Sequence, residues 1–195
     1  ALLQGQVDLI FDDGIGLVVT APISSTKFES DGDTWRTLVE RVHEQGALIA
    51  ARIVWPTEAA VEQAAAAGFD LLLVDRDDDP TVIDELPALI HRVRDKWRAG
   101  GMIGAIVHDR PATRAAVVGH AAQLVRAGAS LLWVSSQGGG NARLPAAPLA
   151  DRLRNELGVA TCIVGTDASL SDLDAAIAAG RADLVAVDRK PVPRS

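Results

Sequence analysis

The sequence predicts an α/β fold, namely an incomplete (β/α)8 barrel of the TIM type with about seven strand–helix units. Short apolar runs rich in Val, Ile and Leu recur roughly 20 to 35 residues apart, which leaves room for one strand, one helix and two loops. The runs are continuous rather than alternating, which indicates parallel strands that are buried on both faces. The predicted strands lie in the segments 16–20, 47–54, 69–75, 102–108, 129–135, 159–165 and 182–188.

The segments between these runs have the pattern of amphipathic helices. Two apolar stripes follow helical spacing. They are Trp35, Leu38, Val39 and Val42 in the first helix and Val117, Ala121, Leu124 and Val125 in a later one. Glycine follows several predicted helices, where a left-handed backbone ends a helix at little cost. These glycines are Gly46, Gly68, Gly128, Gly158 and Gly180. Ser169 and Asp172 form the pattern of a capping box at the start of the last helix.

Seven such units allow either a doubly wound open sheet or a barrel in which one strand is missing or unrecognised. No G-x-G-x-x-G motif follows the first strand, and the even spacing shows no break, so the barrel is favoured. We expect a single domain over residues 1–195, with a tail over 190–195 that contains Pro191 and Pro193.

Composition excludes several classes of partner. The net charge of −7 disfavours nucleic acid and anionic membrane surfaces, and the lack of tyrosine disfavours base stacking. The single cysteine, Cys162, allows no internal disulfide, so we expect a cytoplasmic protein. No apolar run reaches the roughly 20 residues of a membrane span, and the first residues lack the pattern of a signal peptide.

The C-terminal third carries a family resemblance. The segment 158–189 reads GVATCIVGTDASLSDLDAAIAAGRADLVAVDR, and its most specific part is Gly180–Val185. With 127–139, 35–46 and 66–70, it is similar to the NADH:flavin oxidoreductase, or old yellow enzyme, family. A close variant is the reductase-like C-terminal domain of bifunctional aryl-CoA hydroxylases of the salicylyl-CoA type. The resemblance implies that the family's first strand is absent and that residues 1–13 form the helix before the first recognised strand.

That resemblance implies FMN as the cofactor, with its phosphate held after the last two strands. The matching positions are Gly165, Thr166, Asp188 and Arg189, and Arg189 is suited to pair with phosphate. Thr166 and Asp188 replace glycines, which would hinder close approach of the backbone and place a negative charge beside a dianion.

The family's substrate-binding donor pair falls on Asp75 and Asp78. An ionised carboxylate accepts hydrogen bonds and cannot donate them, so this pair would not polarise a substrate carbonyl. Arg52 and Trp55 occupy the positions of a flavin-contacting Gln and a His, and the family's active-site loop and flavin-contacting Arg are missing. The resemblance therefore implies a degenerate site.

The residues themselves leave alternatives open. Asp75 with residues 77–79 could hold a metal, although an exposed turn is the simpler interpretation. Arg52 either pairs with an aspartate such as Asp75 or extends its charge to the barrel end. His108 is either a general base at a strand end or an ordinary loop residue. Ser135 and Ser136 precede three glycines, and this segment is either an anion-binding nest or a flexible loop.

Three hypotheses follow. The first is a degenerate flavin-oxidoreductase-like barrel without ene-reductase activity, which serves as a scaffold, oligomerisation or substrate-docking part of a larger flavoenzyme. Its partner would be an upstream monooxygenase domain, or a second subunit in a homo-oligomer. The second is a working FMN-dependent NAD(P)H oxidoreductase. The third is a barrel enzyme or binder for a phosphorylated ligand, which would use Gly165, Thr166, Arg189, Arg52 and His108.

Overall fold

The computed structural model describes residues 16–76, 85–109, 115–136, 144–164 and 169–186. The chain divides into two compact units. The first holds the described residues 16–76 and 92–102, and the second holds 85–91 and those from 103 onward. Helix α5 (Leu86–Arg94) and strand β5 (Met102–Asp109) each have residues in both units.

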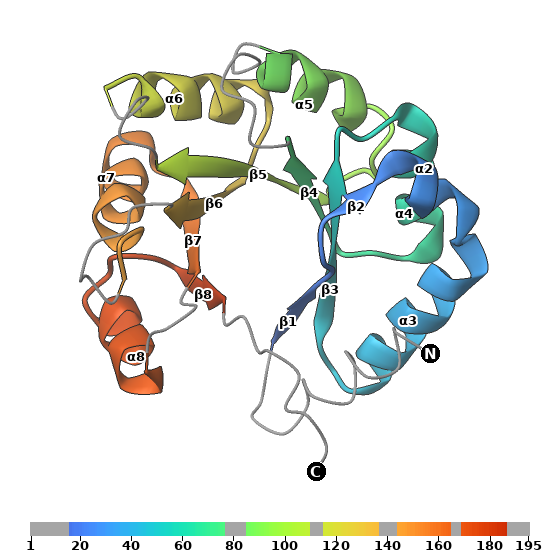
Figure 1. Ribbon diagram of the computed structural model, residues 1–195, viewed down its shortest axis with the longest axis horizontal. Helices are drawn as coiled ribbons and strands as arrows, with labels where there is room; N and C mark the ends of the chain where they lie inside the picture. Colours follow the sequence, from blue (N-terminus) through green and yellow to red (C-terminus); the bar gives the residue numbers. More distant parts are fainter. Residues whose placement is uncertain (1–15, 77–84, 110–114, 137–143, 165–168, 187–195) are drawn as a thin grey trace. The chain divides into compact units, whose positions relative to one another are not determined.

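The first unit is a parallel sheet with helices on one face. Strand β3 (Leu48–Val54) pairs with β4 (Leu71–Asp75) on one side and with β1 (Leu17–Val19) and the two-residue β2 (Ile23–Ser24) on the other. All of these pairings are parallel. Figure 1 shows the helices beside β3 on one side of it. These helices are α2 (Ser25–Ser30), α3 (Gly32–Glu44) and α4 (Glu58–Ala67).

The second unit repeats this arrangement. Its strands pair in parallel in the order β5, β6 (Leu131–Ser136), β7 (Ala160–Val164) and β8 (Leu184–Ala186). The helices between them are α6 (Val117–Ala127), α7 (Ala147–Leu157) and α8 (Leu170–Ala178). Figure 1 shows α7 and α8 along the outer side of β7 and β8. Each of the seven predicted strand segments contains a strand, and only β2 was not predicted.

The predicted helix stripes are the buried faces of the helices. Trp35, Leu38, Val39 and Val42 of α3 are all buried, as are Val117, Ala121 and Leu124 of α6, whereas Val125 is only half-buried. In the first unit, Phe28 of α2 stacks on Trp35 at a centroid distance of 4.9 Å and contacts Phe69 at 5.7 Å. The Trp35 indole N–H donates to the carbonyl of Phe28 at 3.0 Å, so the buried donor is satisfied.

The predicted helix ends are confirmed. Gly68 after α4 and Gly128 after α6 have φ of 93° and 117°, a backbone that favours glycine. At the start of α8, the Ser169 hydroxyl accepts from the Asp172 amide at 3.2 Å, and the Asp172 carboxylate accepts from the Ser169 amide at 3.2 Å. This is the capping box that the sequence predicts.

An aspartate before a strand ties neighbouring strands together in each unit. Asp70, before β4, accepts hydrogen bonds from the Ile49 amide at 2.8 Å and from His43 at 2.9 Å. Asp183, before β8, accepts from the Thr161 amide at 2.9 Å and from Arg154 at 2.8 Å. Burial alone would raise the pKa of each carboxyl, but these hydrogen bonds and the adjacent positive charges hold both pKa values below 3.8.

None of the helices in the described part of the chain has the length and apolar character that a membrane span requires. The predicted helix over residues 1–13 and the tail over 190–195 lie outside the described residues, and the single-domain expectation stays a prediction.

Candidate functional site

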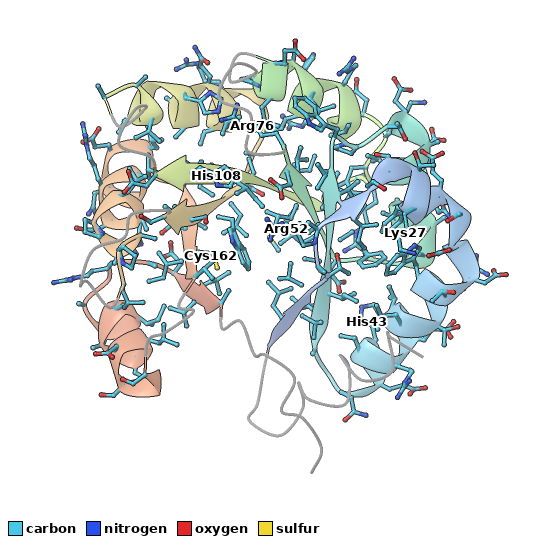
Figure 2. All side chains as sticks on the ribbon, in the orientation of Figure 1. Lys27, His43, Arg52, Arg76, His108 and Cys162 are labelled. Carbon is cyan, nitrogen blue, oxygen red and sulfur yellow. The ribbon has the colours of Figure 1, made fainter. Side chains whose placement is uncertain are left out.

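The carboxyl ends of β3 and β4 bring together the charged pair that the sequence singles out. In the parallel register, Arg52 of β3 lies opposite Leu73, and Val54 lies opposite Asp75 at the end of β4. Residues two apart on a strand share a face, so Arg52 and Asp75 project from the same face of the sheet. Figure 2 shows Arg52 on the side of β3 that faces away from α3 and α4.

Arg52 and Asp75 form a hydrogen-bonded ion pair, as the first of the two interpretations of Arg52 predicts. The Nε and Nη2 atoms of Arg52 donate to Oδ2 of Asp75 at 2.9 and 2.8 Å. The Asp75 side chain is only 6% exposed, whereas that of Arg52 is 25% exposed. The Nη1 group of Arg52 makes no hydrogen bond to any described residue. The cation is therefore fixed in position by Asp75, while its side chain as a whole remains partly exposed.

Two hydroxyl residues, which the sequence analysis missed, hold the backbone around this pair. The Arg52 amide donates to the hydroxyl of Thr20, just after β1, at 3.0 Å, and the Thr20 amide donates to the carbonyl of Ala50 at 3.1 Å. Ser25, at the start of α2, is buried and donates to the carbonyl of Trp55 at 2.8 Å. The same hydroxyl accepts from the Thr57 amide at 3.1 Å. No spacing in the sequence links residues 20 and 25 to residues 52 and 55.

Trp55, directly after β3, has a strained backbone. Its φ of 49° is the only positive φ at a residue other than glycine among the described residues. Pro56 follows it, and a residue before proline ordinarily takes an extended backbone. The Trp55 amide donates to the backbone carbonyl of Asp75 at 3.0 Å, while its own carbonyl accepts from Ser25. These two hydrogen bonds hold a conformation that costs roughly 1–2 kcal/mol for an L-residue.

This strain gives a testable difference between two variants. Trp55→Gly and Trp55→Ala both remove the indole, but only glycine adopts a positive φ without strain. We expect Trp55→Gly to be more stable than Trp55→Ala by about 1 kcal/mol, measured by urea unfolding at equilibrium. Gly16→Ala serves as the control, because a Cβ there would contact nothing within 4 Å. Equal stabilities of the two Trp55 variants would contradict the strain.

The second unit carries its own pair of polar residues at the strand ends. His108 of β5 is in register with Ser135 of β6, so the two side chains share a face on adjacent strands. His108 and Ser135 are both partly buried, whereas Asp109 is buried. The role of His108 as a general base stays a prediction.

The remaining predicted site residues lie outside the described part of the chain. These are Asp78, Gly165, Thr166, Asp188 and Arg189. Asp75 is described, but residues 77–79 are not, so the alternative of an acidic metal site is not tested. Among the residues that are described, no group of three or more His, Cys, Asp or Glu side chains is placed to hold a metal ion.

Cys162 of β7 is buried, as the sequence predicts. Burial raises the pKa of its thiol to about 12, so it stays protonated at neutral pH. Only the thiolate form of cysteine is a good nucleophile, so the protonated Cys162 serves as a packing residue.

Comparisons with solved structures identify the fold. The thiamine phosphate pyrophosphorylase from Pyrococcus furiosus superposes with a TM-score of 0.62 at 15% identity, over 96% of this chain and 79% of that one. The YdjI aldolase from Escherichia coli K12 superposes with a TM-score of 0.65 at 18% identity, over 96% of this chain and 70% of the aldolase. Methylornithine synthase (PylB) superposes with a TM-score of 0.63 at 12% identity, over 99% of this chain and 62% of the synthase. No family model matches the chain, and no curated protein matches it in sequence.

These likenesses confirm the predicted fold class. The chain is a parallel α/β protein of the TIM-barrel type, in which seven strands of the described residues, β2 aside, alternate with helices. At such low identity the likeness concerns the fold and not the chemistry.

The predicted membership of the old yellow enzyme family is wrong. The similar structures named above are a pyrophosphorylase, an aldolase and a methylornithine synthase, and no sequence comparison supports a flavin oxidoreductase. The degenerate-reductase interpretation and the expectation of FMN rested on that resemblance and lose their support with it.

The physical reason is that three residues of the most specific motif, Gly180–Val185, serve the fold itself. Gly180 ends α8 with φ of 68°, Ala182 is buried, and Asp183 ties β8 to Thr161 of β7. The segment 66–70 ends in the same way, with Gly68 and Asp70 in equivalent positions before β4. The motif therefore identifies a strand–helix unit rather than a chemistry.

Proposed function

We propose that this barrel-type protein binds a phosphorylated, or otherwise anionic, small molecule at the carboxyl ends of β3 and β4. The observation that carries the proposal is Arg52, whose partly exposed side chain is held by buried Asp75 on the sheet face opposite the helices. In barrels of this type, ligands bind at the carboxyl ends of the strands, where side chains from several strands converge.

The energetics of the pair favour a binding role over a purely structural one. An ion pair removed from water gains little net stability, because the desolvation of both charges offsets their attraction. Two apolar residues on this face would fill the same space at no such cost. Asp75 instead fixes two of the guanidinium nitrogens and leaves Nη1 for an incoming acceptor. A fixed guanidinium loses little conformational entropy when an anion binds, which raises affinity.

The comparisons are compatible with this proposal. One of the similar structures is named a thiamine phosphate pyrophosphorylase, so a protein with a similar fold has a phosphorylated compound in its name. The predicted contributions of Gly165, Thr166 and Arg189 to phosphate binding, and of His108 to proton transfer, stay predictions and are not needed for the proposal.

The proposal is tested by the binding of inorganic phosphate and pyrophosphate, measured by calorimetry and by the rise in melting temperature. We expect the wild-type protein to bind at least one of these anions. Arg52→Gln should reduce its affinity about tenfold or more, because a charge-assisted hydrogen bond contributes roughly 1.5–3 kcal/mol. Arg52→Lys keeps the positive charge but lacks the planar guanidinium, so its affinity for the anion should lie between those of the wild-type protein and Arg52→Gln.

The matched control is Arg152→Gln, since Arg152 is an exposed arginine of α7 that pairs with Glu156 at 2.6 Å. It should leave the affinity unchanged. Circular dichroism of each variant establishes that the fold is retained. Wild-type affinity in a folded Arg52→Gln variant, or no anion binding by the wild-type protein, would refute the proposal.

A further inference from the structure

Asp75 links two different features at the end of the sheet. Its carboxylate holds the guanidinium of Arg52, and its backbone carbonyl accepts from the amide of Trp55. The Trp55 backbone is therefore hydrogen-bonded to Asp75, and Asp75 in turn holds the guanidinium of Arg52, the candidate anion-binding group. Trp55 lies three residues after Arg52 in the chain, on the turn that leaves β3.

The turn itself does not need a tryptophan. Glycine, or an asparagine, takes a positive φ with less strain than an aromatic residue does. A bulky side chain in this conformation persists only when something else favours it, and such strain concentrates at functional sites.

Trp55 is not part of the aromatic cluster of the first unit. The aromatic cluster of the first unit consists of Phe28, Trp35 and Phe69, and Trp55 makes no ring contact with any described residue. The buried indole of Trp35 donates its N–H to a carbonyl, whereas that of Trp55 donates to none of the described residues. Trp55 is only partly buried, so some of its ring surface faces solvent.

We propose that Trp55 is a ligand-contacting residue, and that the ligand of this site is an anion that also carries a planar ring. Arg52 binds the anionic group, and the indole packs against the ring. The proposal deepens the proposed function and rests on it. Ring stacking on an indole strengthens binding without a further charged group, which suits a site whose cation is already partly neutralised by Asp75.

The test compares phenyl phosphate with methyl phosphate, which carry the same anionic group with and without a ring. We expect wild-type protein to bind phenyl phosphate about fivefold more tightly than methyl phosphate, because stacking of two aromatic rings adds to the binding free energy by about this factor. Trp55→Ala should abolish this preference, so that the variant binds phenyl phosphate and methyl phosphate with equal affinity. Trp55→Phe, which keeps a ring, should retain most of the preference. Arg52→Gln should weaken the binding of both compounds.

Tryptophan fluorescence gives a second readout that a merely structural role would not produce. Phenyl phosphate should change the emission of the wild-type protein, which has four tryptophans, and not that of Trp55→Phe. If wild-type protein binds both compounds equally through Arg52, the role of Trp55 is refuted and the proposed function stands. If neither compound binds to the folded protein, both proposals fail.

Discussion

Replacing Phe28 by alanine is expected to lower the free energy of unfolding by about 3–5 kcal/mol. Phe28 is fully buried in the first unit and packs between the rings of Trp35 and Phe69. The substitution removes this apolar surface and leaves a cavity that the two remaining aromatic rings fill only in part. Urea unfolding followed by tryptophan emission measures the change, since Trp35 reports on the same cluster.

The control for this substitution is Leu48→Ala, which truncates an apolar residue of the same unit that is 47% exposed. It should cost less than about 1 kcal/mol, because little buried surface is lost. A change in Phe28→Ala that is no larger than in Leu48→Ala would show that the cluster is not the centre of this unit's core.

The second large effect is expected for Arg52→Met, which should lower the free energy of unfolding by about 2–3 kcal/mol. The substitution leaves the Asp75 carboxylate, which is 6% exposed, without its guanidinium. The loss should fall below the roughly 3–5 kcal/mol of a fully buried pair, because Arg52 keeps contact with water. Unfolding by urea at neutral pH measures it.

The double variant Arg52→Met with Asp75→Leu separates stability from binding. It should recover most of the lost stability, because two apolar side chains then face each other with no charge between them. It should still fail to bind phosphate. A double variant as unstable as Arg52→Met alone would instead indicate that the charge pair itself contributes to stability.

The pairing of Arg52 with Asp75 was predictable from the sequence for a simple reason. An arginine inside an apolar strand requires a nearby anion, and the adjacent strand ends in an aspartate. Parallel strands place their carboxyl ends together, so strand order made Asp75 a candidate partner, although the sequence left open that Arg52 extends its charge to the barrel end. Trp55 was noticed only through a family resemblance, and neither its left-handed backbone nor its hydrogen bond to Asp75 was expected.

The mistaken family assignment has a physical cause as well. A short motif is specific only if its residues serve the chemistry, and here they serve the fold. Gly180 and Asp183 end a helix and tie two strands, tasks that Gly68 and Asp70 also perform in the other unit. Any barrel of this type requires residues of this kind at such positions, whatever reaction it catalyses.

The sequence by itself determined the strands, the buried helix faces and the helix ends, because these depend on residue types within one or two turns of the chain. It also offered the ion pair of Arg52 with Asp75 as one of two interpretations, and the structure decided between them. Only the tertiary structure decided that Thr20 and Ser25 support residues 52 and 55, and that Trp55 takes a strained turn. Those features depend on the register and packing of segments about 30 residues apart, which no local pattern encodes.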